Sequence, residues 1–111
     1  MFDRLYELGA HRAVVGDGFW HGQPDDWCLE NLGEMARSVA EVSDLATARG
    51  WVVDELDVST LDEWDAFERH WAEGVRTVGT PGAIAFAEQR TEEYQRYRGV
   101  LGFAWLQLRR A

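Results

Sequence analysis

The residues with the clearest chemical potential stand in one short stretch, residues 13–20, which reads Ala-Val-Val-Gly-Asp-Gly-Phe-Trp. An apolar run stops there at Asp17, an acid between two glycines. Phe19, Trp20 and then His21 follow it. A carboxylate at the end of a strand can orient a ligand or take its proton, and aromatic rings can wall a pocket or hold a cation against their faces. We therefore predict that Asp17 is a catalytic residue. We predict that Phe19, Trp20 and His21 bind a substrate. The alternative is that the acid caps a turn and the rings fill the core.

A second group of polar residues comes next in the chain, and it consists of His21, Asp25, Asp26 and Cys28. Their spacing matches no known pattern of metal ligands, and no second His or Cys pair supports one, so we predict no metal site. Because Cys28 is the only cysteine, it cannot form an internal disulfide, which fits a reducing, cytoplasmic location. No basic residue stands next to this thiol to activate it, so we do not expect it to act as a nucleophile.

The composition excludes some classes of partner. The chain has 111 residues, which suits one domain, and a net charge of −9 that comes from 20 acidic and 11 basic residues. A sequence pI near 4.6 argues against binding to nucleic acid or to an anionic membrane surface. No run of apolar residues approaches the length that crosses a bilayer.

Hydrophobic periodicity and turn residues predict an alternation of helices and strands. The expected elements are a helix at 2–8, a strand at 12–17, a loop at 18–28, a helical turn at 29–35, a helix at 39–49, a strand at 51–58, a helix from 60 that Gly74 or Gly79 ends, a helix at 81–97 and a strand at 100–108. The Ser38–Glu41 and Thr60–Glu63 patterns are capping boxes, which indicate where two of these helices begin.

Three strands are expected, and their composition indicates their order in the sheet. Residues 100–108 are apolar on both faces, which favours a central strand. Residues 51–58 carry three acids, which are typical of an edge strand. The stripe that runs through Trp64 and Phe67 on the helix after them recurs at steps of three and four, and it is more often core than a ligand site. The fold class is therefore α/β, with a three-stranded sheet and flanking helices.

With these elements in place, the sequence resembles the C-terminal half of class I S-adenosylmethionine-dependent methyltransferases, above all a group of bacterial methyltransferase-domain proteins. The resemblance spans nearly the whole chain, residues 1–111, as a single truncated domain. Four stretches carry it, and they are Leu5–Leu8 with Arg12–Trp20, Leu45–Trp51, Ser59–Glu68 and Tyr97–Trp105.

The resemblance implies a partial Rossmann-like sheet. It assigns residues 12–17, 51–58 and 100–108 to strands five, six and seven of the methyltransferase fold, with the last strand antiparallel and central, in the order 5-7-6. It also implies S-adenosylmethionine as a cofactor, and it places Asp17 where an acid could orient a methyl acceptor or take its proton.

The sequence departs from the family in the elements that bind the cofactor. No glycine-rich turn follows a first strand, and the nearest candidate, Gly16–Gly18, follows the wrong strand and opens a loop. The turn at Gly9–His11 is also shorter than the family's. We therefore expect this chain to bind no cofactor by itself, because the cofactor half of the fold is missing, and the sequence leaves open whether it is an enzyme.

Without a fourth strand beside it, the strand at 12–17 would be an exposed apolar edge with no Lys or Pro to protect it. We therefore expect a homodimer or a larger homo-oligomer that forms through this edge. Three functions remain open. The chain is a truncated or degenerate methyltransferase-like domain that is not catalytic alone, the acceptor-binding half of an enzyme that another chain or segment completes, or a small-molecule-binding module that uses the pocket near Asp17.

Overall fold

The computed structural model describes all residues, 1–111, and contains five helices and three strands. In chain order these elements are α1 (Phe2–Glu7), β1 (Arg12–Trp20), α2 (Asp26–Leu32), α3 (Val39–Ala48), β2 (Trp51–Val58), α4 (Leu61–Arg76), α5 (Pro81–Tyr97) and β3 (Leu101–Arg110). The caps explain two of these boundaries. Ser38 accepts a hydrogen bond from the backbone of Glu41 at the start of α3, and Thr60 and Glu63 form a complete capping box at the start of α4.

The three strands form one sheet in the order β1-β3-β2. Both β1 and β2 pair antiparallel with β3, so the two outer strands run parallel to each other with β3 between them. Leu106 at the middle of β3 lies between Val15 of β1 and Leu56 of β2. The predictions of a central last strand and of an edge strand at 51–58 are confirmed.

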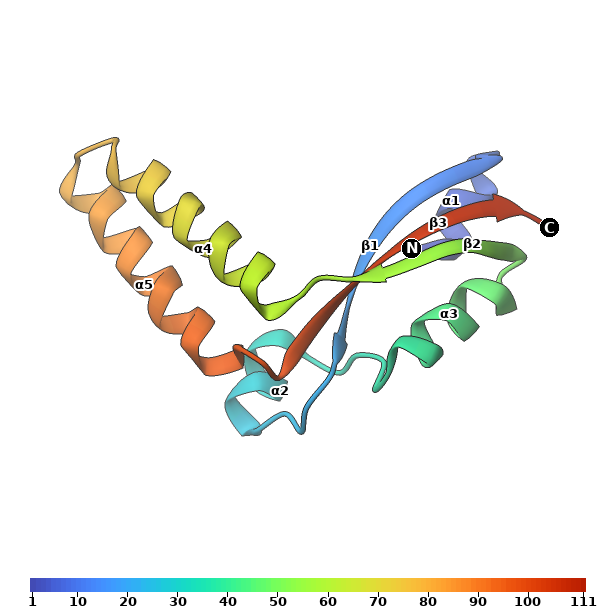
Figure 1. Ribbon diagram of the computed structural model, residues 1–111, viewed down its shortest axis with the longest axis horizontal. Coiled ribbons are helices and arrows are strands. Elements are labelled where there is room, and N and C mark those ends of the chain that lie inside the picture. Colours follow the sequence, from blue (N-terminus) through green and yellow to red (C-terminus); the bar gives the residue numbers. More distant parts are fainter.

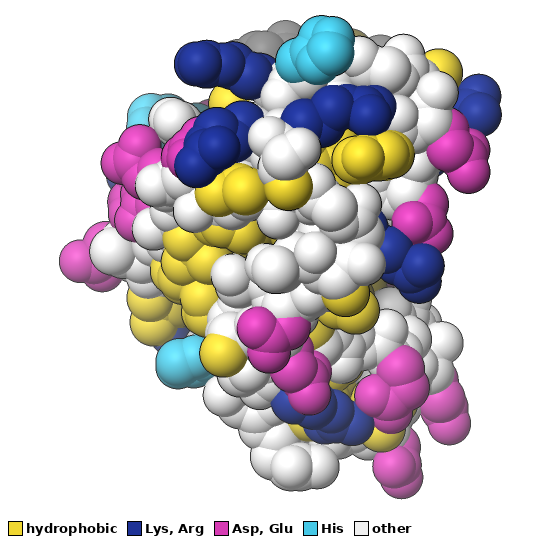
Figure 2. Space-filling view, turned by 90° about the vertical axis from the view of Figure 1, so that its right-hand side faces the viewer, with side chains coloured by type: hydrophobic (Ala, Val, Ile, Leu, Met, Phe, Trp, Pro, Cys, Tyr) yellow, Lys and Arg dark blue, Asp and Glu magenta, His cyan; other side chains and the backbone are white.

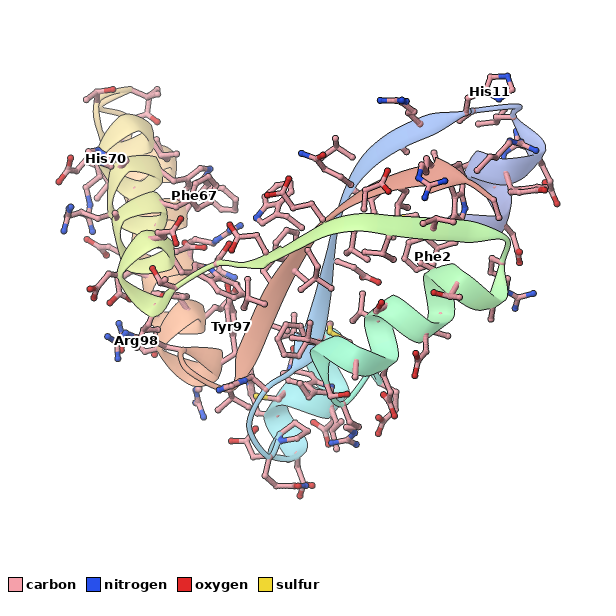
Figure 3. The ribbon with its side chains drawn as sticks, turned by 45° about the vertical axis from the view of Figure 1, so that its right-hand side comes forward. Phe2, His11, Phe67, His70, Tyr97 and Arg98 are labelled. Atoms are coloured by element: carbon pink, nitrogen blue, oxygen red, sulfur yellow. The ribbon has the colours of Figure 1, made fainter.

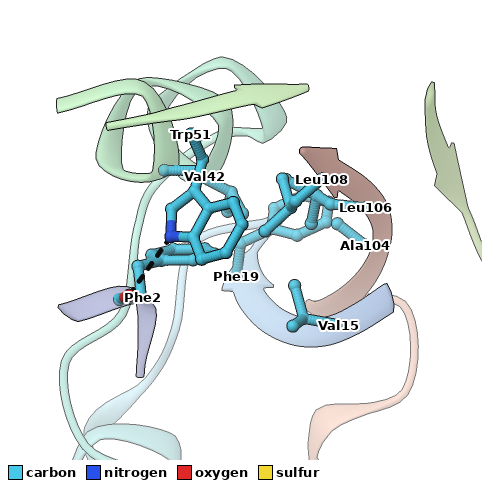
Figure 4. Close-up of a cluster of buried hydrophobic side chains, with 9 residues drawn as sticks. Phe2, Val15, Phe19, Val42, Trp51, Ala104, Leu106 and Leu108 are labelled. Atoms are coloured by element: carbon cyan, nitrogen blue, oxygen red, sulfur yellow. Dashed lines mark hydrogen bonds between the residues drawn. The ribbon is translucent and has the colours of Figure 1, made fainter. Parts of the chain in front are cut away.

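One face of the sheet carries the core, and α1 and α3 cover it (Figure 4). Val42 and Ala46 of α3 are fully buried there against Ala104, Leu106 and Leu108 of β3. The indole nitrogen of Trp51 donates a hydrogen bond to the carbonyl of Phe2 at 3.2 Å, which fastens α1 to the start of β2. Leu45 of the same helix points away from the core and is exposed.

Strand β1 is longer than the sequence predicts, since it continues through Gly18 to Trp20 where a loop was expected. The glycines do not break the strand, and at residue 16 aromatic rings from β3 occupy the space that a side chain would take. A Cβ atom at residue 16 would stand 2.5 Å from the ring of Phe103. Asp17 therefore lies within the strand, opposite Ala104, and not at its end.

Helices α4 and α5 form a hairpin, residues 61–97, that projects away from the sheet and that we call the arm (Figure 1). The molecule is accordingly elongated, with extents of 49 × 30 × 24 Å. The apolar stripe of α4 does not form a closed core, because Phe67 on it is exposed. The residues of α4 that are buried are Glu68 and Ala72.

The outer face of the sheet, opposite the core, is only partly covered. Val14, whose side chain lies on this face, is 70 % exposed. The outer edge of β1 is unpaired over residues 12–18. Only its C-terminal end is covered, by a short parallel bridge between Phe19 and Ala36. At the end of the molecule where the sheet lies, apolar side chains gather among charged ones (Figure 2). No helix is long and apolar enough to cross a membrane.

Candidate functional site

The residues predicted to form a site around Asp17 do not surround one cavity. Side chains alternate along a strand, so Asp17 points to the same face as Val15 and Phe19, which is the core face. Trp20 points to the opposite face. Phe19 and Trp20 are each only 1 % exposed, so neither ring presents a surface to a ligand. The role of Asp17 stays a prediction, and its carboxylate lies half-buried among residues of the core face.

Trp20 and His21 do share one shallow cavity, which Gly22, Gln23 and Arg37 complete. The indole nitrogen of Trp20 donates a hydrogen bond to the carbonyl of Gly33 at 3.1 Å, which fixes the ring below the surface. The imidazole of His21 is exposed and packs edge-on against Phe19, with ring centroids 6.1 Å apart. These contacts are typical of residues that close the end of a core.

A hollow lined mainly by aromatic side chains lies elsewhere, in the angle between the arm and the outer face of the sheet (Figure 3). We call it the groove. It measures about 500 Å³, which is within the range of small-molecule sites. Phe67 lies on the side of α4 that faces the sheet, and Tyr97 lies where α5 returns toward it. The residues that line the groove are Ser59, Glu63, Trp64, Phe67, Glu68, Arg90, Tyr97, Phe103 and Trp105.

Aromatic rings from three elements form the wall of the groove. Trp64 of α4 packs with its ring centroid 6.2 Å from that of Tyr97 and 6.2 Å from that of Phe103. Phe103 in turn packs edge-on against Trp105, with centroids 5.1 Å apart and planes at 67°. The indole nitrogen of Trp105 donates a hydrogen bond to the hydroxyl of Ser59 at 3.1 Å. These contacts hold the rings in fixed orientations beside open space.

The groove also has a polar end, where Glu68 and Arg90 form an ion pair. The Nε and Nη2 atoms of Arg90 donate to the two carboxylate oxygens of Glu68 at 3.2 and 3.0 Å. The guanidinium lies over the ring of Trp71, 4.9 Å from its centroid. Glu68 belongs to α4 and Arg90 to α5, so the pair links the two helices. Its carboxylate side is buried, since Glu68 is only 6 % exposed. The pairing with Glu68 raises the pKa of Arg90, which stays charged.

A second polar cluster joins the two helices on the other side of the arm. The carboxylate of Asp65 accepts hydrogen bonds from Arg98 at 2.8 Å and from the hydroxyl of Tyr94 at 2.7 Å. The Arg98 bond and then the Tyr94 bond lower the pKa of Asp65 to about 2. Burial, and then the bond to Asp65, raise the pKa of Tyr94. Each of these polar groups has its hydrogen-bond partner within the cluster, so we interpret the cluster as a link that holds α4 against α5.

The structure offers no cradle for S-adenosylmethionine. The fold binds that cofactor at a glycine-rich turn between a strand and a helix, where backbone N–H groups are free. Here the helix that follows β1 begins at Asp25, whose side chain accepts from the backbone of Cys28, and the helix that follows β2 begins at the Thr60 capping box. The residues present therefore do not fit the cofactor.

The chain likewise brings no cluster of metal-binding side chains together. No three residues of the types His, Cys, Asp and Glu approach closely enough to hold an ion. The thiol of Cys28 is buried and points to the carbonyl of Arg96 at 3.7 Å. Burial raises the pKa of this thiol, which leaves it protonated and unreactive.

Sequence reasoning missed the groove, although it named several of its residues. The stripe through Trp64 and Phe67 was interpreted as core, and Phe103 and Trp105 as one buried face of a central strand. One signal was available, because an aromatic stripe on α4 and two rings on β3 exceed what a three-stranded sheet can bury on its outer face. Arg90 carried no signal, since its partner Glu68 is 22 residues away.

Comparison with solved structures identifies the fold. The chain superposes on the crystal structure of a SAM-dependent methyltransferase from Geobacter sulfurreducens in complex with S-adenosyl-L-homocysteine with a TM-score of 0.62 and 19 % identity. A SAM-dependent methyltransferase from Thiobacillus denitrificans in complex with the same molecule gives 0.63 and 19 %. YjhP from E. coli gives 0.57 and 15 %.

In each superposition 90 % of this chain is matched, against 46 % of the first two structures and 49 % of the third. The chain thus spans about half of the length of the structures that it matches. No protein-family model matches it. A search of curated proteins finds no match either. At this level of identity the superpositions establish architecture, and the three-stranded sheet with its flanking helices is that of the methyltransferase fold.

Proposed function

We propose that this chain is a methyltransferase-like domain that corresponds to the C-terminal half of the fold and that does not transfer methyl groups by itself. The observation that carries the proposal is the sheet, in which an antiparallel β3 separates two parallel strands while the outer edge of β1 is open. That order is the 5-7-6 order expected from the resemblance. The match of 90 % of this chain to about half of each related structure supports it.

The proposed inability of the chain to transfer methyl groups by itself follows from the way in which α2 and α4 begin. Both helices that follow a strand begin at a side-chain cap, which already occupies one of the backbone N–H groups that a cofactor carboxylate would use, and no glycine-rich turn precedes either helix. S-adenosylmethionine would therefore have to be bound by another chain or segment. In such an assembly this chain supplies the acceptor side, and Asp17 remains the acid proposed to orient or deprotonate the acceptor.

The free edge of β1 is the surface through which this chain associates. Residues 12–18 present unpaired backbone groups, and the side chain of Val14, which is one of these residues, is largely exposed. An edge of this kind recruits a further strand. We propose that a second copy of the chain supplies it, so that the chain is a homodimer or a larger homo-oligomer.

Two measurements on the purified chain test this function. Calorimetric titration with S-adenosylhomocysteine should show no binding, and micromolar affinity for the chain alone would contradict the proposed lack of a cofactor site. Size-exclusion chromatography with light scattering should give at least twice the chain mass of 12.7 kDa. A monomer at all micromolar concentrations would contradict the association through β1.

A further inference from the structure

We propose that the groove between the arm and the sheet binds a planar aromatic molecule that carries a neutral hydroxyl or carbonyl oxygen. The binding does not depend on the proposed function, because the groove opens on the outer face of the sheet and Asp17 lies on the opposite, core face. The groove is the polar-ended aromatic hollow lined by Phe67, Tyr97 and Trp105 among others, and nothing in the roles discussed above uses it.

The first step of the argument concerns the ring of Trp105, which is exposed yet held in place. It is 48 % exposed, its nitrogen is bonded to Ser59, and its ring packs edge-on against Phe103. Beneath it, a Cβ atom at Gly16 would stand 3.1 Å from the indole, so the strand has no side chain there. A large ring with a fixed orientation and a free face is a preorganised stacking surface.

The second step concerns the opposite side of the groove. Phe67 projects from α4 toward the sheet and is 59 % exposed (Figure 3). Neighbouring rings of the wall lie 5.1 to 6.2 Å apart, from centroid to centroid, and contact one another. Rings that contact one another leave no gap for a cation cage, whereas Phe67 and Trp105, which are both exposed and both line the groove, offer surfaces on which a flat ligand can stack.

The third step concerns the polar end. The hydroxyl of Tyr97 forms no hydrogen bond within the chain, and the Nη1 atom of Arg90 forms none either, because Nε and Nη2 are bonded to Glu68. Burial, and then the charge of Glu68, raise the pKa of Tyr97, so this hydroxyl stays protonated and can donate. Two donors beside a neutralised ion pair suit a neutral oxygen acceptor better than a full negative charge.

The probe for the experiment is 2-naphthol, which is planar and neutral at pH 7. We would titrate it into the 15N-labelled chain and follow the indole N–H signals by NMR. The signals of Trp64 and Trp105 should move and saturate, with a dissociation constant on the order of 0.1 mM. The signals of Trp20 and Trp51, which are buried away from the groove, should stay in place.

Comparison ligands separate the chemical contributions. Decahydro-2-naphthol keeps the hydroxyl but loses the flat ring, and 2-naphthoate keeps the ring but adds a charge. Both should bind at least about tenfold more weakly than 2-naphthol. Equal binding of decahydro-2-naphthol would overturn the stacking argument, and tighter binding of 2-naphthoate would overturn the argument for a neutral oxygen.

Variants then locate the site. Trp105→Ala and Phe67→Ala, both at exposed positions, should each weaken 2-naphthol by about tenfold, and Tyr97→Phe should weaken it by a smaller factor. Phe86→Ala is the matched control, because this exposed ring lies on the arm but does not line the groove. Absence of saturable binding, or the same affinity in Trp105→Ala, would overturn the proposal. Because no cofactor is present, either result is independent of the calorimetric test of function.

Discussion

Phe19 lies directly over Gly102 of the neighbouring strand, and its ring occupies the place where a side chain at residue 102 would begin. A Cβ atom built there would stand 2.5 Å from the ring. The two residues are paired in the β1–β3 register, and both are buried. This contact joins the first strand of the chain to the last one.

The contact predicts that Gly102→Ala destabilises the protein. The ring of Phe19 is fully buried and cannot move aside without leaving its place in the core, so we expect a loss of about 1 to 3 kcal/mol in the free energy of unfolding. Urea denaturation followed by circular dichroism measures it. Gly74→Ala is the control, because that site in α4 is open and alanine there should stabilise by about 0.5 to 1 kcal/mol. Equal effects at the two sites would contradict the packing.

The ion pair of Glu68 and Arg90 predicts an asymmetric response to substitution. Arg90→Met leaves a buried carboxylate without its partner, and we expect a loss of about 1 to 3 kcal/mol because Arg90 itself is partly exposed. The double variant Glu68→Leu with Arg90→Met should recover part of that loss. Thermal unfolding of the three proteins measures the difference, and a double variant less stable than Arg90→Met would contradict it.

The Asp65 cluster predicts a dependence of stability on acid. The pKa of Asp65 is about 2 in the folded chain against an ordinary value of 3.8, so its contribution is present above about pH 4 and is lost as the pH falls toward 2. Asp65→Asn should lower stability at neutral pH and flatten the decline between these pH values. Asp44→Asn, at an exposed acid of α3, should leave the decline unchanged. Unfolding curves at pH 2 to 7 decide between these outcomes.

The thiol of Cys28 predicts slow modification of the native chain. It is buried between α2 and α5, and its raised pKa keeps it protonated. Reaction with 5,5′-dithiobis(2-nitrobenzoate) at pH 8 should therefore be slow until urea unfolds the protein, when one thiol per chain should react at once. Fast labelling of the native protein would show that α2 does not pack against α5 as described.

The open edge of β1 predicts that a charge at Val14 breaks the oligomer. Lysine discourages strand pairing at sheet edges, so Val14→Lys should shift the chain to a monomer in light scattering. Val78→Lys is a matched control, because Val78 is 67 % exposed against 70 % for Val14 but lies in the turn between α4 and α5. Should both variants remain oligomeric, the association would not use this edge.

Local signals in the sequence were sufficient for most element starts and for the order of the sheet. The caps at Ser38 and Thr60 act through residues three positions apart. The structure has the Ser38 cap and the complete capping box at Thr60, whereas the Glu41 side chain accepts from the backbone of Arg37. The length of β1 could not be predicted in this way. Gly16 and Gly18 were interpreted as breakers. The rings that need a glycine at residue 16 come from β3, more than eighty residues later in the chain.

The candidate site was harder to predict than the fold, for a related reason. Periodicity shows that Phe67 and Trp64 share a face of a helix, but it does not show what covers that face. The angle between the arm and the sheet decides that Phe67 and Trp105 border a groove and not a core. That angle depends on the junction at Tyr97 and Phe103, which only the assembled chain defines.

The position of β3 in the sheet has a consequence for how the chain folds. Arg12 pairs with Arg109, and β1 and β2 do not pair with each other, so no sheet can form until the last strand has been synthesised. Contacts so distant in sequence make folding slow and leave apolar segments of β1 and β2 exposed on the nascent chain. We therefore expect the newly made protein to depend on chaperones until residues 101–110 have left the ribosome and the sheet can form.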